Sequence, residues 1–386
     1  MKRYLTLEDV DVAGKRVLVR SDLNVPLEED GSISDDFRIR AAIPTLERLV
    51  SSGARVTVCS HLGRPKGPNH HYSMRAVADR LMQLMGRDVT MGKHADGEIR
   101  VMENTRFEEG ETTNDPVFAA RLADGQDLFV QDAFGSVHRA HASTVGVAGL
   151  VKSVAGPLLD GELTAFTKFT DEPEHPYTVV LGGAKISDKL GVIENLLPRV
   201  DQMLIGGGMC FTFLKARGEQ VGASMVQDDM IESASALLEG EHGTKIVLPI
   251  DVVASTSFTP AGSNRIVSVH SMTEHEMGLD IGPQTSNLFA DTIRRSQTIF
   301  WNGPMGVFEW ASYRKGTDRV ASAMAATEGF TGVGGGDSAA AIRALGYDDA
   351  IDHLSTGGGA GLELLEGRVL PGVEALERWA EDQGGQ

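Results

Sequence analysis

Short hydrophobic runs alternate along the whole chain with longer amphipathic segments whose apolar positions recur at helical spacing. This alternation predicts parallel β-sheets covered by helices on both faces, the α/β class. In the first half we predict strands at residues 16–23, 54–61, 88–92, 99–104 and 127–134. The segment between the first two begins with acidic capping residues and ends at Gly53, so it predicts a helix and one right-handed βαβ unit.

The second half repeats the pattern, and each apolar run leads into glycine, proline or a carboxylate. The runs are YTVVLGGAK, QMLIGGGM, KIVLPIDV, TIFWNGPMG, FTGVGGGDS and DHLSTGGGAG. In an open α/β sheet, ligands bind beyond the carboxyl ends of the strands. These six strand ends therefore predict one site of nucleotide size.

The length of the chain indicates two domains, because 386 residues exceed the size at which a single core continues to grow. Residues 156–176 read as a helix followed by a charged linker that contains prolines. We predict an N-terminal domain at 1–155, an interdomain helix at 156–171, a C-terminal domain at 172–370 and a final segment at 371–386.

Composition argues against several classes of partner. Acidic residues outnumber basic ones 54 to 36, a net charge of -18, which disfavours nucleic acid as the main partner. No apolar run is long enough to span a membrane and the N-terminus lacks a signal-like segment, so a soluble, cytoplasmic protein is expected. Cys59 and Cys210 lie in apolar stretches without metal-ligand spacing and are predicted to be buried thiols.

Arginines of the first half stand where predicted strands and helices meet: Arg38, Arg40, Arg64, Arg106 and Arg139. A single arginine is most often a solvated surface residue, whereas several together favour a site for a small, multiply charged anion.

Asp22 and Asn24 end the first strand, and Asp22 is either a salt-bridge partner or an acceptor for substrate hydroxyls. His61 follows the second strand and is either structural or part of the same site. His138 and His141 lack a third metal ligand.

The glycine loop GVGGGDSAAA offers backbone N–H groups and a helix N-terminus to phosphate, although it carries an acid, Asp337. The sequence contains neither GxxxxGK[ST] nor GxGxxG followed by a ribose-binding acid, so a P-loop kinase and an NAD-dependent oxidoreductase are not supported. Lys185 and Lys189, four apart after a glycine turn, are predicted on one face of a helix start. A nucleotide phosphate between them explains this better than two solvated lysines do. Glu309 is either an exposed acid or a partner of ribose hydroxyls.

Taken together, the motifs resemble those of the phosphoglycerate kinase family along essentially the whole chain. In the family's order they are RSDLNVPL, DDFRIRAAIPT, SHLGRP, ENTRF, DAFGSVHRAHAS, LGGAKISDKL, IGGGMCFTFLK, DIGPQT, WNGPMGVFE, GGGDSAAA and STGGGAGLELLEG. The resemblance implies two Rossmann-like parallel-sheet domains facing a cleft and joined by a helix and hinge, with residues 371–386 returning to the N-terminal domain. It further implies a monomeric glycolytic and gluconeogenic kinase with hinge-bending closure. This kinase would reversibly transfer a phosphoryl group between Mg²⁺-bound ATP and the carboxylate of 3-phosphoglycerate, giving ADP and 1,3-bisphosphoglycerate.

The resemblance also implies a role for individual residues. Those expected to bind 3-phosphoglycerate are Asp22, Asn24, Arg38, His61, Leu62, Gly63, Arg64, Arg106 and Arg139. Those expected to bind the nucleotide are Lys185, Lys189, Asn302, Glu309, Gly335, Gly336, Asp337 and Ser338. Arg38 and Lys185 would stabilise the transferring group, and Asp337 would bind Mg²⁺. A non-catalytic nucleotide-binding protein with the same fold would show losses among these charged positions, and none is seen.

Overall fold

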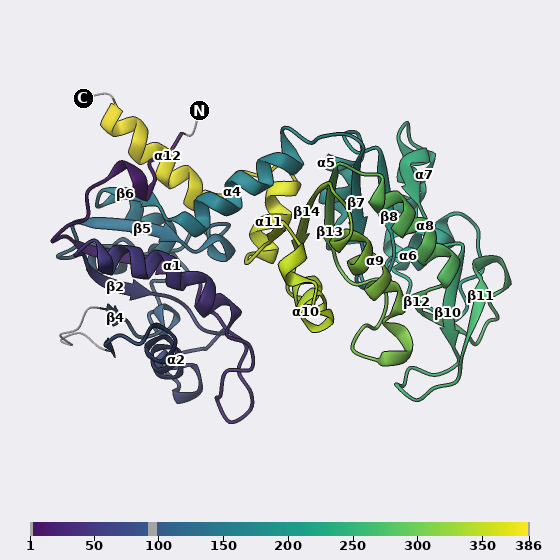
Figure 1. The fold of residues 1–386 in the computed structure, drawn as a ribbon, viewed down its shortest axis with the longest axis horizontal. Coiled ribbons are helices and arrows are strands. Elements are labelled where there is room, and N and C mark those ends of the chain that lie inside the picture. Colours follow the sequence, from purple (N-terminus) through teal and green to yellow (C-terminus); the bar gives the residue numbers. More distant parts are fainter. Residues whose placement is uncertain (1–2, 92–98, 385–386) are drawn as a thin grey trace. The chain divides into compact units, whose positions relative to one another are not determined.

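The computed structural model describes residues 3–91 and 99–384. Gly92 of the strand predicted at 88–92 and the outermost residues of the predicted domain ranges lie outside this part of the chain. Contacts divide the described chain into two compact units (Figure 1). Unit 1 comprises the residues up to Thr164 and those from Val369 onward, and unit 2 is Ala165–Arg368. The boundary falls within helix α4 (Pro157–Thr170).

Unit 1 contains a six-stranded parallel sheet. Its strands, in spatial order, are β3 (Val89–Met91), β4 (Ile99–Val101), β2 (Arg55–Cys59), β1 (Arg16–Ser21), β5 (Leu128–Asp132) and β6 (Ser153–Ala155). The helices are α1 (Phe37–Ser51), α2 (Arg75–Met85), α3 (Pro116–Ala123) and α12 (Pro371–Gly384), with the first part of α4. All five predicted strands of this half are present, and β6 is an addition that the sequence did not indicate.

Both faces of this sheet are buried, as the alternation along β1 shows. Val17 and Val19 belong to one hydrophobic cluster together with Leu46 of α1. Leu18, between them, belongs to a second cluster with Phe129 of β5. Strands covered on both faces become almost continuously apolar, which is the pattern that predicted a parallel sheet.

Unit 2 contains a second six-stranded parallel sheet. Its strands, in spatial order, are β15 (His353–Leu354), β14 (Phe330–Gly334), β13 (Thr298–Asn302), β7 (Tyr177–Leu181), β8 (Gln202–Ile205) and β9 (Ile246–Val247). Its helices are α5 (Leu190–Leu196), α6 (Cys210–Ala216), α7 (Ile231–Glu239), α8 (Pro283–Arg294), α9 (Lys315–Ala325), α10 (Gly336–Leu345) and α11 (Gly358–Leu365). The six runs singled out in the sequence supply these six strands, so the predicted α/β class with two parallel sheets is confirmed.

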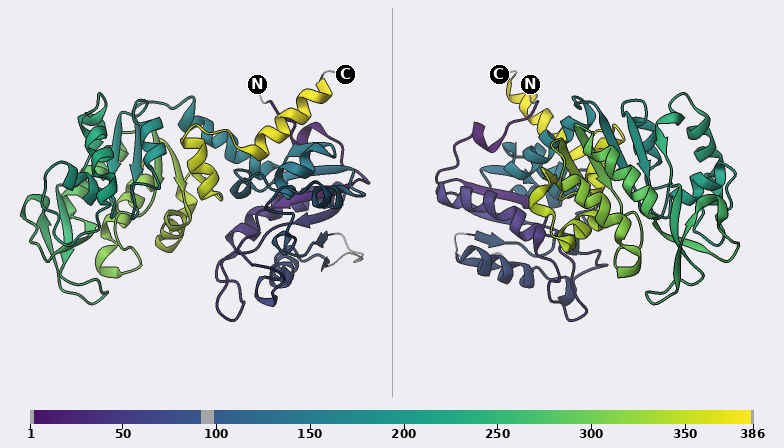
Figure 2. Two further views of the ribbon diagram at one scale, coloured as in Figure 1. Left: turned by 180° about the vertical axis from the view of Figure 1, so that it is seen from behind. Right: turned by 45° about the vertical axis from the view of Figure 1, so that its right-hand side comes forward.

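A small antiparallel sheet, which the sequence did not reveal, is added to unit 2. It consists of β11 (Asn264–Ser268), β10 (Asp251–Ser255) and β12 (Met277–Ile281), in that order. Figures 1 and 2 show it at the end of unit 2, beside α8. In the described part of the chain, no helix has both the length and the apolar character needed to cross a membrane.

Candidate active site

A cluster of basic side chains lies at the carboxyl edge of the unit 1 sheet. Asp22 directly follows β1, His61 and Arg64 follow β2, and Arg106 lies in the turn after β4. Arg139 follows the turn after β5. Strands β4, β2, β1 and β5 are neighbours and run parallel, so these loops meet at one edge of the sheet. We refer to Arg20, Arg38, His61, Arg64, Arg106, His138 and Arg139 as the basic cluster.

Hydrogen bonds fix several of the predicted substrate-binding residues relative to one another. Arg38 Nη1 donates to the carbonyl oxygen of Asn24 at 2.9 Å and lies 3.3 Å from Oδ1 of Asp22. The Asn24 side chain accepts a hydrogen bond from the N–H of Gly63 at 2.7 Å, and Arg106 donates to the Gly63 carbonyl. Helix α1 therefore presents Arg38 to the same edge as the strand-end loops.

Burial and neighbouring positive charges lower two pKa values within the basic cluster. Burial, together with Arg139, Arg20 and Arg64, lowers the pKa of Arg106 to about 10. Burial and several surrounding guanidinium groups hold the pKa of His61 well below its usual range. Nε of Arg106 is buried and has no hydrogen-bond partner in the described chain. A multiply charged anion would satisfy this donor and relieve the repulsion.

Arg20 and Glu111 belong to this site but were missed from the sequence. Arg20 is only 1% exposed, and its Nε donates to Ser143 Oγ at 2.9 Å. Glu111 is fully buried, accepts from Ser143 Oγ at 2.6 Å, and is a counter-charge to Arg20. An arginine inside the apolar run VLVRSDL was a usable signal for Arg20, whereas nothing distinguished Glu111 from its acidic neighbours.

Leu62 contributes to this edge through its backbone, which is already engaged. Its N–H donates to Asn104 Oδ1 at 3.2 Å, and its carbonyl accepts from Asn104 Nδ2 at 2.8 Å. Asn104 is nearly fully buried and was not singled out in the sequence. Leu62 therefore anchors the loop that carries His61 and Arg64.

In unit 2, the loops that follow β7, β8 and β13 cross at backbone contact distance. A Cβ atom on Gly207 would lie 2.5 Å from the nitrogen of Gly183, and one on Gly303 would lie 2.4 Å from the carbonyl oxygen of Gly182. Gly207 and Gly303 also have φ values of +63° and +93°. Only glycine combines this conformation with so close an approach.

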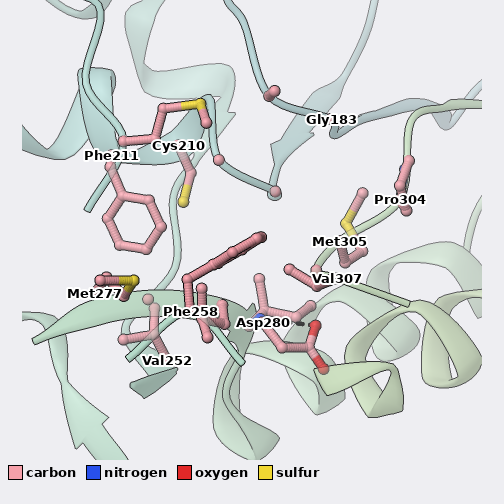
Figure 3. A pocket seen from close by; sticks show the side chains of 18 of the residues that line it. Gly183, Cys210, Phe211, Val252, Phe258, Met277, Asp280, Pro304, Met305 and Val307 are labelled. Atoms are coloured by element: carbon pink, nitrogen blue, oxygen red, sulfur yellow. Dashed lines mark hydrogen bonds between the residues drawn. The ribbon is translucent and has the colours of Figure 1, made fainter. Parts of the chain in front are cut away.

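A cavity of about 530 Å³ opens beside these loops (Figure 3). Phe211, Phe258 and Met277 belong to its largely apolar lining. Glu309 and Asp337 add carboxylates. Phe258, from the loop between β10 and β11, is 61% exposed, and its ring lies 4.7 Å from that of Trp310. A largely apolar cavity with few polar groups suits a planar heteroaromatic base.

The glycine loop after β14 places Asp337 in the first turn of α10, exposed, next to Gly336, where a Cβ would meet only open space. Asn302 and Ser338 are buried here. Nδ2 of Asn302 donates to the carbonyl of Gly334 at 2.8 Å, and Oγ of Ser338 accepts from the N–H of Gly303 at 2.6 Å. These contacts position the loop, and direct phosphate binding by the two residues stays a prediction.

The predicted placement of Lys185 and Lys189 on one helix face is wrong. Helix α5 begins at Leu190, after both lysines. The glycine turn before them is bonded to the loop after β13, because the N–H groups of Gly182 and Gly183 donate to the carbonyl oxygens of Asn302 and Pro304. Lys185 is exposed, whereas Lys189 is partly buried close to Gly183. Burial lowers the pKa of Lys189, and the charges of Asp188 and Asp337 oppose that shift. The Lys189 ammonium therefore lies beside the glycine turn, within the electrostatic influence of Asp337.

Asp280 also lines the cavity, and its carboxyl group turns toward α9. Its oxygens accept from the N–H groups of Ile281 at 2.9 Å and Gly316 at 2.8 Å, the latter at the start of α9. Burial raises the pKa of Asp280 to about 8, more than these two donors lower it. The protonated form is therefore favoured at neutral pH.

Replacing Asp280 by asparagine is expected to remove a pH-dependent loss of stability. The pKa is raised from 3.8 to about 8 in the folded state. The stability linked to this group is thus fully present below about pH 4 and is lost as the pH rises through about 8. Between about pH 5 and 8, the free energy of unfolding of the wild type, measured in urea, should fall relative to that of Asp280→Asn as the pH rises. The expected fall is up to about 1.4 kcal/mol per pH unit. The exposed Asp349→Asn variant is the control, and an equal pH dependence in wild type and Asp280→Asn would contradict the assignment.

Comparison with known proteins gives one consistent family. A sequence model of phosphoglycerate kinase matches residues 7–368. The chain is 52% identical to a phosphoglycerate kinase of Salinispora tropica, over 96% of this chain and 99% of that protein. It is 49% identical to one from Deinococcus radiodurans, over 96% and 94%. The solved structure of phosphoglycerate kinase from Coxiella burnetii superposes with a TM-score of 0.89 at 37% identity, covering 98% of this chain and all of that one.

Proposed function

This chain belongs to the phosphoglycerate kinase family, and we propose that it reversibly transfers the γ-phosphoryl group of ATP to the carboxylate of 3-phosphoglycerate, giving ADP and 1,3-bisphosphoglycerate. The observation that carries this proposal is the basic cluster, a partly buried site with more positive charge than its own carboxylates neutralise. A small substrate with both a phosphate and a carboxylate supplies the missing negative charge.

We assign the acceptor to unit 1. Arg64, Arg106 and Arg139 supply guanidinium groups for its phosphate and carboxylate, and Asp22 and Asn24 hold Arg38 beside them. The acceptor carboxylate is already an anionic nucleophile, so the reaction needs no general base. His61, which is neutral in this environment, is assigned to binding.

We assign the nucleotide to the cavity of unit 2. Phe258 and Met277 would hold the base, and Glu309 the ribose. Lys185, Lys189 and the loop Gly335–Ser338 would lie along the phosphates. This arrangement rests on the proximity of Lys189 to Asp337 and of both residues to the glycine turns. Two hydrogen bonds fix the position of that loop: one from Asn302 to the Gly334 carbonyl, and one from the N–H of Gly303 to Ser338.

Mg²⁺ fits this site as an ion held jointly by the protein and the nucleotide. Asp337 offers one exposed carboxylate at the cavity, and no group of three or more metal-ligating side chains occurs among the residues that the structure describes. Mg²⁺ in kinases is commonly bound by one or two carboxylates together with substrate phosphates. When bound, it would neutralise phosphate charge, while Asp337 would hold it and Lys189 would offset the remaining negative charge.

The chain's contribution to the rate is then positioning and charge stabilisation. Arg38 and Lys185 would share the charge that spreads over the oxygens of the transferring group. Since acceptor and donor are assigned to different units, hinge-bending closure and exclusion of water are part of the proposal. A monomeric state and a cytoplasmic location also remain proposals, to be tested by sedimentation and by fractionation of the source cells.

The proposal is tested by incubating the purified protein with ATP, Mg²⁺ and 3-phosphoglycerate and by coupling the 1,3-bisphosphoglycerate formed to an NADH-consuming reductase. Turnover that requires all three components supports the kinase. A folded sample that binds ATP without turnover would favour a non-catalytic nucleotide-binding protein.

A further inference from the structure

Two histidines of the basic cluster each accept a hydrogen bond from an arginine. Nη2 of Arg20 lies 3.0 Å from Nδ1 of His61, and Nε of Arg139 donates to Nε2 of His138 at 3.0 Å. Arginine can only donate, so each contacted ring nitrogen must carry a lone pair. The imidazole proton then resides on the opposite nitrogen, which is Nε2 in His61 and Nδ1 in His138.

The scaffold gives Arg20 little freedom to abandon this contact. Its other N–H groups donate to Ser143 Oγ at 2.9 Å, to the Ser21 carbonyl at 2.5 Å and to Ser136 Oγ at 3.3 Å. The side chain is almost completely buried. The direction of Nη2 is therefore set by three other bonds, and His61 must adapt to it.

Burial and the surrounding charges keep the two rings neutral. Burial, together with the charges of Arg20, Arg106, Arg139 and Arg38, holds the pKa of His61 well below the usual range. Burial, Arg139 and His141 lower the pKa of His138 to about 4, although Asp22 opposes the shift. Neither ring is expected to gain a second proton near neutral pH.

We propose that Arg20 and Arg139 are positioning residues that fix His61 and His138 in opposite neutral tautomers, so that the anion site presents two uncharged N–H donors beside its guanidinium groups. Nδ1 of His138 is buried and has no partner in the described part of the chain, which leaves this donor available to a ligand. Identifying the ligand as 3-phosphoglycerate rests on the proposed function, whereas the tautomers do not.

This arrangement has a consequence for chemistry and for pH dependence. A ring nitrogen that already accepts a hydrogen bond from arginine cannot take a proton from 3-phosphoglycerate. Neither histidine therefore serves as a general base. The contribution of both imidazoles to binding should also be constant over the neutral range.

The direct test is NMR of the full-length protein with ¹⁵N-labelled histidine, assigned with His61→Gln and His138→Gln. Long-range ¹H–¹⁵N correlations at about pH 7 should place the proton on Nε2 of His61 and on Nδ1 of His138. Both rings should stay neutral when the pH is lowered through the ordinary pKa of histidine, about 6.5. The reverse tautomer, or a charged ring at pH 7, in either residue would overturn the proposal.

Adding 3-phosphoglycerate should move the ¹⁵N resonances of the two protonated ring nitrogens more than those of the two ring nitrogens that accept hydrogen bonds from arginine. Absence of any shift at saturation would overturn the donor role even if the tautomers were as expected. The tautomers themselves are measured on the wild-type protein without ligand, so they are tested even if the kinase assay fails.

Variants separate a donor role from a structural one. His61→Leu should raise the KM for 3-phosphoglycerate by at least about 10-fold with kcat within about threefold, because a hydrogen bond to a charged group is lost. His61→Gln, which keeps an N–H donor, should recover most of this loss. A leucine variant with normal KM, or a glutamine variant no better than leucine, would contradict the donor role. Arg20→Gln should let His61 populate both tautomers, and Arg139→Gln, at the part-buried contact, should do the same for His138. Retention of a single tautomer in either variant would contradict the positioning role.

Discussion

Replacing Arg38 by alanine is expected to lower kcat by at least about 10² while leaving the fold intact. Arginines that stabilise the transferring group are worth about 10³ to 10⁵ in rate in other phosphoryl-transfer enzymes. Arg38 is held toward the acceptor site by Asn24 and Asp22. Helix α1 buries its core through other residues, including Ile39 and Leu46. The fall should therefore appear in turnover and not in the free energy of unfolding.

Arg40→Ala is the matched control for Arg38→Ala. It removes the same charge from the same helix, but Arg40 is largely exposed and pairs with Asp36 at 2.8 Å. Steady-state kinetics with 3-phosphoglycerate as the varied substrate should show near-normal kcat for Arg40→Ala. Near-normal turnover in Arg38→Ala, or equal losses in both variants, would contradict the catalytic assignment of Arg38.

Replacing Asp337 by asparagine is expected to lower kcat by about 10² and to raise the Mg²⁺ concentration for half-maximal rate by at least about 10-fold. Asp337 is the carboxylate of the glycine loop after β14, and it lines the cavity near Lys189. Without its charge, the protein loses its own ligand for an ion that must otherwise be held by phosphates alone. The Mg²⁺ dependence of the initial rate at saturating ATP measures this change.

Asp318→Asn is the control for Asp337→Asn because both residues lie in the first turn of a helix of unit 2. Both substitutions remove a favourable charge from a helix N-terminus, an effect of about 0.3–1 kcal/mol on stability. Only Asp337→Asn should change the Mg²⁺ dependence. If Asp337→Asn left this dependence and the rate unchanged, the loop would not bind the metal.

The parallel sheets could be predicted because strands buried on both faces must be apolar throughout, and β7 and β13 show this plainly. The antiparallel sheet could not. Its edge strand β11 is exposed at most positions, so it carries no alternating pattern. In the run KIVLPIDV, Pro249 separates β9 from β10, and the two strands belong to different sheets. Nothing in the local sequence encodes that change of partner.

At the site, the residue types were predictable and their local geometry was not. Arginines and strand-end polar residues such as Asp22 could be found because the carboxyl ends of parallel strands meet at one edge. The helical spacing of Lys185 and Lys189 was misleading, since tertiary hydrogen bonds from the glycine turn delay the start of α5 until Leu190. Arg20 and Glu111 depend on a buried contact through Ser143, which joins segments far apart in the sequence.

The proposed kinase activity is tested by the rate at which the wild-type protein forms 1,3-bisphosphoglycerate from ATP and 3-phosphoglycerate, measured with and without Mg²⁺. We expect rapid turnover that depends on 3-phosphoglycerate, is abolished by chelating Mg²⁺ and runs in reverse when ADP and 1,3-bisphosphoglycerate are supplied. A folded protein that forms no 1,3-bisphosphoglycerate under these conditions would contradict the proposed kinase activity.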